Sequence, residues 1–132
     1  MLIDVFSADA RFGEASREAV RGCRAEGSLV ACDVVWAEVA AGFSASAEAE
    51  KALTRLGVGF SSLDAEAALL AGHSWRAYRR IGGTRERVIA DFLIGAHAVG
   101  RAERLLTRDR GFYRRCFKEL CVVDPAAGSS GR

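Results

Sequence analysis

The segment DFLIGAHAVGRAERLLTRD, residues 91–109, decides both the fold and the candidate chemistry of this chain. Asp91 opens a nearly all-apolar stretch with helical spacing, a short apolar strand follows at 104–107, and Asp109 closes the segment. A helix that is apolar on every side belongs in the interior of a fold. In a parallel α/β fold, strand ends and helix starts meet at one edge of the sheet. The segment therefore predicts that both carboxylates reach that edge, where they could bind a hard divalent cation.

The rest of the chain alternates helical patterns with short apolar runs. Helices are expected at 13–26, 33–43, 46–56, 64–81, from 91 onward and near 110–117, and strands at 28–32, 58–63, 104–107 and 120–123. Asp33 and Asp64 are expected N-caps, and Gly27 and Gly57 are expected helix stops. This order predicts one α/β domain over residues 1–125, with a parallel sheet covered by helices, followed by a disordered tail at 126–132.

The composition is that of an ordinary globular domain, with 132 residues, 50% hydrophobic and 27% charged. A net charge of +2 does not by itself indicate nucleic-acid binding. Arginines cluster at 76–87 and 101–115, where they could contact phosphates, although a solvated helix face explains any one of them equally well. No signal peptide, membrane span or nucleotide-binding glycine motif is visible. We therefore expect a cytoplasmic protein that makes no membrane contact.

The four cysteines are Cys23, Cys32, Cys116 and Cys121. They have no CxxC spacing, so a zinc site is not expected. Cys32 ends one apolar run and Cys121 lies within another, so both are expected to be small core residues. Reduced thiols fit the cytoplasmic expectation.

Three acidic residues stand out as candidates for chemistry. Glu38 lies in VVWAEVAAGF without a basic partner three or four positions away, and a glutamate at the edge of a buried stripe that reaches into water is its ordinary explanation. An N-cap role would by itself explain Asp91 and Asp109. Thr107 adds a hydroxyl beside Asp109. The three carboxylates are therefore more informative as a set than singly.

The strings WAEVAAGF, DFLIGAHA and LLTRD, in this order and at these separations, resemble the acidic motifs of PIN domains, and most closely those of VapC-type endoribonuclease toxins of toxin–antitoxin operons. The resemblance covers nearly the whole chain. It implies an α/β/α sandwich with a parallel sheet, Mg²⁺ or Mn²⁺ held by clustered acids, hydrolysis of RNA, a cognate antitoxin and a homodimer. Carried over by position, it makes Glu38, Asp91 and Asp109 the catalytic and metal-site carboxylates, Thr107 an auxiliary polar group, and Arg108 a contact for an RNA phosphate.

The N-terminus departs from the family pattern, in which the first strand ends in a further acid. This chain begins MLIDVFSADARF, and two registers are open. In one, Asp4 is that acid and a fourth metal ligand. In the other, which fits better because it keeps the stretch typical of the first helix in place, the strand and its aspartate precede Met1. The second register would leave a central position of the sheet empty, so the neighbouring strands would lack a hydrogen-bonding partner on that side. We then expect the recorded start to be too late and the first strand to be missing or truncated.

Three classes of function compete for this sequence. The first is a metal-dependent endoribonuclease toxin. The second is a catalytically impaired PIN-like module that binds antitoxin or RNA without cleavage, for which Trp36 and Phe43 could form an apolar groove, unless they simply pack in the core. The third is a phosphotransfer receiver domain, which needs paired acids after its first strand and a late lysine. Lys51 and Lys118 are the only lysines, so the third class is poorly supported.

Overall fold

The structure is a computed structural model that describes residues 13–82 and 88–125. Its elements are α2 (Gly13–Glu26), β1 (Leu29–Cys32), α3 (Asp33–Ala40), α4 (Ser46–Leu56), β2 (Val58–Ser61), α5 (Ala65–Arg80), α6 (Ile89–Arg101), β3 (Arg104–Leu106), α7 (Arg110–Cys116) and β4 (Cys121–Val123). The predicted α/β class with parallel strands is confirmed. The predictions made for Asp4, for a first strand and for the tail at 126–132 lie outside the described residues.

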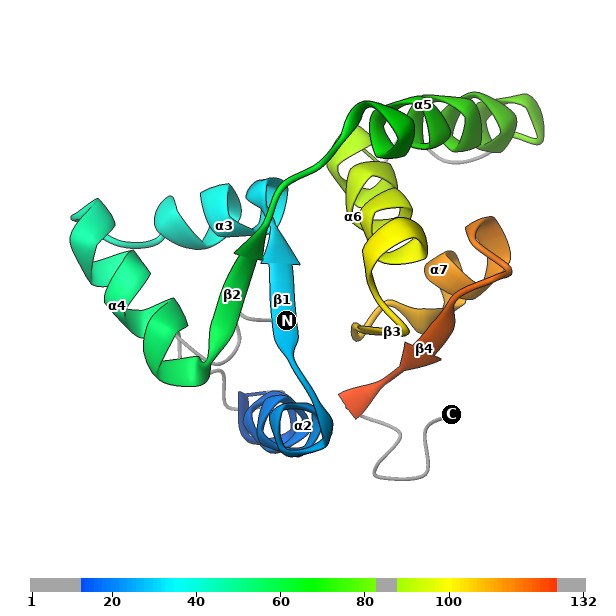
Figure 1. Ribbon diagram of the computed structural model, residues 1–132. Helices are drawn as coiled ribbons and strands as arrows, with labels where there is room; N and C mark the ends of the chain where they lie inside the picture. Colours follow the sequence, from blue (N-terminus) through cyan, green and yellow to red (C-terminus); the bar gives the residue numbers. More distant parts are fainter. Residues whose placement is uncertain (1–12, 83–87, 126–132) are drawn as a thin grey trace.

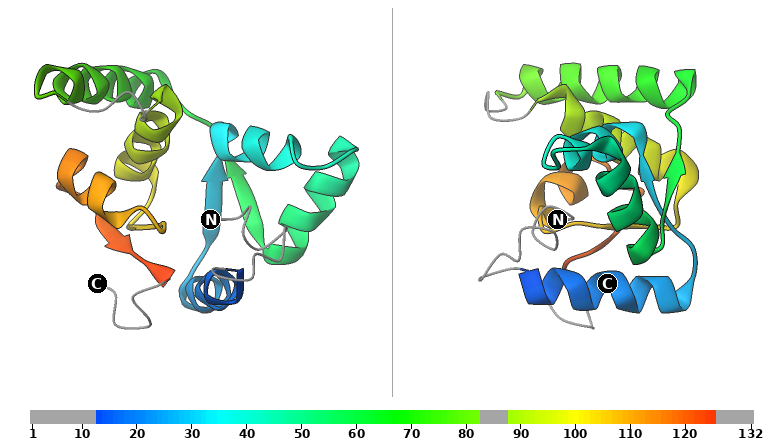
Figure 2. Two further views of the ribbon diagram at one scale, coloured as in Figure 1. Left: turned by 180° about the vertical axis from the view of Figure 1, so that it is seen from behind. Right: turned by 90° about the vertical axis from the view of Figure 1, so that its left-hand side faces the viewer.

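The four described strands form two parallel pairs instead of one continuous sheet. β1 pairs with β2 from Leu29 opposite Val58 to Cys32 opposite Ser61. β3 pairs with β4 from Arg104 opposite Cys121 to Leu106 opposite Val123. Figure 1 shows β1 and β2 with α3 and α4 on one side of the molecule, and β3 and β4 with α6 and α7 on the other. The views in Figure 2 show the same division from behind and from the side.

Each strand pair packs against its own hydrophobic core. The larger core is built on α5, α6, α7 and β4, and its buried members are Ala67, Ala71, Tyr78, Phe92, Ala96, Phe112, Tyr113, Phe117 and Val122. The smaller core joins α3, α4 and β2 through Val39, Leu53 and Val58. Phe92, which follows Asp91 directly, is fully buried at the centre of the larger core. The expectation that this helix lies in the interior is therefore confirmed by Phe92 and by the buried run from Gly95 to Ala98.

Helix ends follow the predicted signals in part. Asp64 is the N-cap of α5, and its side chain accepts a hydrogen bond of 2.8 Å from the N–H of Ala67. Gly57 ends α4 with a φ of 77°, a left-handed conformation that glycine adopts at little cost. The prediction that Asp33 caps α3 is wrong, because Cys32 holds the N-cap position and Asp33 is the first helical residue. The predicted extension of this helix to Phe43 is also wrong, since α3 ends at Ala40.

Two aromatic side chains proposed for a partner groove instead belong to the smaller core. Trp36 and Phe43 both pack against it. The indole N–H of Trp36 donates a hydrogen bond of 3.2 Å to the carbonyl of Gly59, and its ring meets the Phe60 ring edge to face. Core packing therefore explains both residues.

The cysteines divide differently from the sequence expectation. Cys32 is buried, as predicted, but Cys121 is exposed, so its predicted core role is wrong. Cys121 is the first residue of β4, and the strand alternates so that Val122 takes the buried position instead. Within the described part of the chain, no helix is long and apolar enough to cross a membrane.

Candidate functional site

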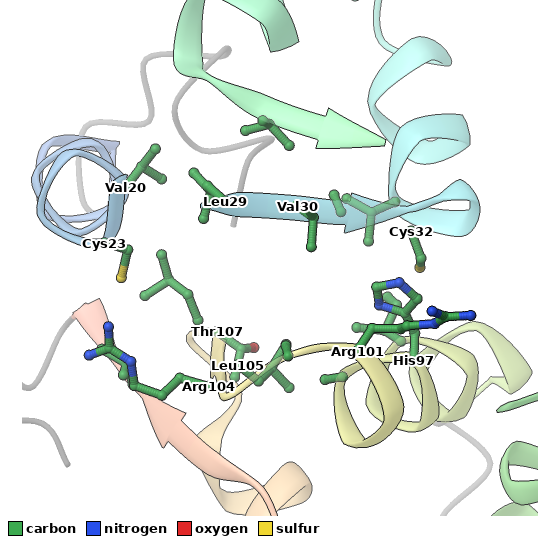
Figure 3. Close-up of a pocket in the computed structure, with 18 of the residues that line it drawn as sticks. Val20, Cys23, Leu29, Val30, Cys32, His97, Arg101, Arg104, Leu105 and Thr107 are labelled. Carbon is green, nitrogen blue, oxygen red and sulfur yellow. The ribbon is translucent and has the colours of Figure 1, made fainter. Parts of the chain in front are cut away.

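A cavity of about 650 Å³ separates the two halves of the fold. Residues of α2, β1, α3, α6 and β3 line it, together with those that follow β3. Figure 3 shows its middle, where Leu29 and Val30 of β1 face Leu105 and Thr107 across the opening. Four of the residues predicted to form a site line this one cavity: Glu38, Asp91, Thr107 and Asp109. Glu38 lies on α3, Asp91 lies on α6, and Thr107 and Asp109 follow β3, so the fold brings together residues that are far apart in the sequence.

Asp91 lies in the first turn of α6 but does not hold the N-cap position. The helix begins at Ile89 and Val88 is the N-cap, so an N-cap role does not explain Asp91. The carboxylate instead reaches back and accepts a hydrogen bond of 3.3 Å from the N–H of Val88. A carboxylate in the first helical turn is stabilised by the unpaired N–H groups and the helix dipole. This contact uses one oxygen, Oδ2, and orients the half-buried side chain at the cavity wall.

Asp109 lies between β3 and α7 and is the N-cap of α7, as predicted, although its side chain makes no capping hydrogen bond. Its backbone N–H donates to Oγ1 of Thr107 at 3.1 Å. Thr107 lies one residue beyond the end of strand β3, and its N–H donates a hydrogen bond of 3.0 Å to the carbonyl of Val123. Thr107 therefore fixes the backbone of Asp109 against β4.

Glu38 and Arg108 are both exposed. Glu38 lies on α3, on the β1 side of the cavity, opposite the elements that carry the two aspartates. Arg108 directly precedes Asp109 but does not line the cavity.

The carboxylate oxygens in the cavity suit a hard divalent cation, but the described residues do not form a complete set of metal ligands. Carboxylate oxygens are the ligands that Mg²⁺ and Mn²⁺ prefer, and five carboxylate side chains line the cavity: Glu26, Glu38, Asp91, Glu103 and Asp109. Across residues 13–82 and 88–125, however, no three His, Cys, Asp or Glu side chains lie close enough together to hold a metal ion. Glu38 in particular stands on the opposite half of the fold from Asp91 and Asp109. The chemistry of the acids therefore fits a cation, while their present spacing does not.

A polar contact that the sequence did not reveal joins the two halves near the cavity. Nε2 of His97 and Oγ of Ser61 are 2.8 Å apart and hydrogen-bonded, although 36 positions separate them in the chain. Burial holds the pKa of His97 below its ordinary value of 6.5, and Arg101 lowers the pKa further, while Asp33 opposes this shift. His97 is only 5% exposed, as expected for a helix residue packed in the interior.

Asp33, the first residue of α3, has one carboxylate oxygen that is buried and has no hydrogen-bond partner among the described residues. An unpaired buried acceptor costs about 1–3 kcal/mol. This unpaired oxygen could not be predicted, because the pattern around Asp33 suggested only an ordinary helix cap.

The arginines at the cavity are already paired with acids. Arg104 binds Glu26 at 2.8 Å, and Arg101 binds Asp64 at 3.1 Å. The ion pair with Glu26 raises the pKa of Arg104. The hydrogen bond from the N–H of Ala67 lowers the pKa of Asp64, with a further contribution from Arg101. These pairs connect α2 to β3 and α5 to α6, so they position elements around the cavity.

Comparison with known proteins identifies the family of this architecture. The model of the PIN domain family matches residues 1–118. No curated protein matches the chain. Among solved structures, a chain from the structure of VapBC-1 from nontypeable Haemophilus influenzae superimposes with a TM-score of 0.68. The match covers 95% of this chain and 92% of that one, at 18% sequence identity, and it shows a shared fold.

Proposed function

We propose, because this chain belongs to the PIN domain family, that it is a divalent-cation-dependent endoribonuclease and the toxin of a toxin–antitoxin pair. PIN domains are generally nucleases. The observation that carries the proposal is the convergence of Glu38, Asp91 and Asp109 on one cavity from three separate elements. The likeness to a chain of VapBC-1 supports the toxin assignment and a cognate antitoxin as partner. A homodimer and a cytoplasmic location belong to the same proposal.

The roles proposed for the residues follow from their positions. A hydrogen bond from Val88 holds the carboxylate of Asp91 at the cavity wall, and Thr107 fixes the backbone of Asp109 beside it. Glu38 approaches from α3, and Arg108 receives a neighbouring phosphate of the RNA. A bound Mg²⁺ or Mn²⁺ would neutralise charge on the scissile phosphate and increase the acidity of water. Within the described residues, these acids do not group closely enough to complete a cation site by themselves.

The experiment compares cleavage of a 5′-labelled RNA with Mg²⁺ or Mn²⁺ and with a chelator in excess. The matched variants are Glu38→Gln and Glu50→Gln, since Glu50 is an exposed acid on α4 that does not line the cavity. We expect cation-dependent cleavage that Glu38→Gln lowers by about 100-fold or more, the scale of losing a charged group that acts in the transition state. Glu50→Gln should cleave like the unmodified chain. Cleavage that persists in the chelator, or equal loss in both variants, would contradict the proposal.

The second candidate is a catalytically impaired PIN-like module that binds antitoxin or RNA without cleaving RNA. The absence of a closed group of metal ligands within the described residues favours it. Retained binding of RNA, measured by fluorescence anisotropy, together with no cation-dependent cleavage, would select this function over the first.

A further inference from the structure

A buried hydrogen bond joins the helix that carries Asp91 to the end of the β1–β2 pair. Nε2 of His97, on α6, and Oγ of Ser61, the last residue of β2, are 2.8 Å apart. The parallel register places Ser61 opposite Cys32, the last residue of β1, and α3 begins at the next residue, Asp33. Residues of α3 and α6 also lie close together. His97 therefore binds the strand pair at the point where α3 begins.

The two helices that meet at this junction each carry a candidate catalytic carboxylate. On α6, Asp91 lies less than two turns before His97. On α3, Glu38 lies less than two turns after Asp33. Short helical segments move as rigid units. A displacement of His97 relative to the start of α3 therefore changes the separation of Glu38 and Asp91 as well.

The hydrogen bond between His97 and Ser61 is shielded from water, since the histidine is 5% exposed. Burial is the largest of the effects that hold the pKa of His97 below its ordinary value of 6.5, so the ring is neutral at pH 7. A hydroxyl both donates and accepts, so Ser61 satisfies Nε2 whichever ring nitrogen carries the proton. Removal of one partner leaves the other buried without a bond, which costs more than the bond itself contributes.

Neighbouring polar groups give this junction little additional support. One carboxylate oxygen of Asp33 is buried and has no hydrogen-bond partner among the described residues, so that atom contributes no bond. At the opposite end of the cavity (Figure 3), Arg104 and Glu26 form an ion pair whose side chains are 36% and 59% exposed. Ion pairs exposed to this degree contribute little to stability. The bond from His97 to Ser61 is therefore well placed to hold α6 against the end of β2.

We propose that His97 is a positioning residue: through Ser61 it holds α6 against the ends of β1 and β2, and so sets where Asp91 lies relative to Glu38. The consequence for these two acids rests on the proposed function. In this role His97 neither binds the cation nor contacts the RNA. Without His97 the acids are still present, but α3 and α6 are free to move apart, so a cation binds less tightly.

Thiol labelling measures whether His97 holds this junction closed. Cys32 is 2% exposed, and Figure 3 shows its side chain pointing toward the ring of His97. A buried thiol reacts with N-ethylmaleimide only when the structure around it opens, so the labelling rate reports the population of the open form. Cys116 on α7, half-buried against the larger core, is the internal reference within the same molecule. Mass spectrometry of the digested protein separates the two thiols.

The variants are His97→Leu, Ser61→Ala and the two combined. We expect each single change to speed the labelling of Cys32 by about fivefold, the scale of one net hydrogen bond, with the labelling of Cys116 unchanged. The combined variant should be slower than the product of the two single effects predicts, because both changes remove the same bond. Ser62→Ala is the matched control, since Ser62 is exposed and its hydroxyl bonds to a neighbouring carbonyl instead. It should leave the labelling of Cys32 unchanged.

The cation dependence of RNA cleavage separates positioning from simple destabilisation. When the junction is loose, part of the binding free energy of the cation is used to order α3 and α6, so the apparent affinity falls by up to the contribution of the lost bond. We expect Ser61→Ala to raise the Mg²⁺ concentration for half-maximal cleavage by about two- to fivefold. The rate at saturating Mg²⁺ should stay within about twofold of the unmodified chain. A smaller folded fraction would instead lower the maximal rate and leave the half-maximal concentration unchanged.

Unchanged labelling of Cys32 in both single variants would overturn the inference, as would equal acceleration of Cys32 and Cys116. If His97→Leu unfolds, Ser61→Ala decides the question alone. A lower maximal rate with an unchanged half-maximal Mg²⁺ concentration would overturn the positioning role.

Failure of the unmodified chain to cleave RNA would contradict the proposed function, and the labelling of Cys32 would still show whether His97 holds the junction. Titration with Mn²⁺, followed by electron paramagnetic resonance, then replaces cleavage. Equal affinity of the unmodified chain and Ser61→Ala for Mn²⁺, or no binding by either, would overturn the positioning role.

Discussion

Replacement of Phe92 by alanine should be among the most destabilising single changes in this chain. The ring is fully buried and lies within 6.5 Å, centroid to centroid, of the rings of Trp75, Tyr78, Phe112 and Phe117. It therefore connects α5, α6 and α7 at one point. It also directly follows Asp91, so the same ring fixes the start of the helix that carries a candidate catalytic carboxylate.

The expected loss can be estimated from its parts. Burying a phenylalanine side chain contributes about 1.5–3 kcal/mol through transfer from water. A residual cavity of about 60 Å³ would add about 1.5 kcal/mol at about 24 cal/mol per Å³. The sum, about 3–4.5 kcal/mol, lies within the usual range for Phe→Ala in a core and is a large part of the stability of a small domain.

Urea denaturation followed by circular dichroism measures this loss by linear extrapolation. Leu69→Ala is the matched control, because Leu69 is 75% exposed on α5 and its loss should change the free energy of unfolding by no more than about 0.5 kcal/mol. A loss below about 1 kcal/mol for Phe92→Ala would refute the claim that this aromatic cluster organises the larger core.

Three further substitutions test other contacts by the same unfolding measurement. Gly95→Ala would place a Cβ 2.6 Å from Cδ2 of the buried Phe117 ring. We expect the free energy of unfolding to fall by about 1–2 kcal/mol, even after a gain of about 1 kcal/mol in helix propensity. A more stable variant would contradict this packing. Burial holds the pKa of His97 below the 6.5 of an unfolded chain, so the unfolded state binds more protons between these two pKa values. The free energy of unfolding should therefore fall as the pH drops below about 6.5. His97→Gln should flatten this pH dependence, and an unchanged slope would refute the assignment. Trp36→Phe removes the hydrogen bond to the carbonyl of Gly59 and should cost about 1 kcal/mol, whereas no loss would place the indole N–H in water in both states.

Local patterns in the sequence were sufficient to place most elements of the fold. The apolar run after Asp91 predicted an interior helix because such a run cannot face water on any side. Gly57 and Asp64 were correct signals because each acts through its own backbone conformation or through a neighbour three residues away. The error at Asp33 also comes from the use of local signals alone. A cap position depends on where the preceding strand ends, and β1 extends through Cys32.

Contacts between distant segments could not be predicted from the sequence. Nothing in the chain pairs Ser61 with His97, or Glu26 with Arg104, which are 78 positions apart. The exposure of Cys121 depends on which face of β4 meets the core, and a three-residue strand is too short to show that alternation. The candidate site shares this limit. Residue types identified Glu38, Asp91 and Asp109, but only the fold shows that they line one cavity and that they do not yet form a cluster.

Cleavage of a labelled RNA by the Asp91→Asn variant in the presence of Mg²⁺ tests the central claim most directly. Asparagine keeps an oxygen that can accept the hydrogen bond from Val88, so the helix start should survive with a loss of no more than about 1 kcal/mol. We expect a folded protein, verified by circular dichroism, whose cleavage rate is lower by about 100-fold or more, while Glu50→Gln remains fully active. Equal cleavage by Asp91→Asn and the unmodified chain would contradict it.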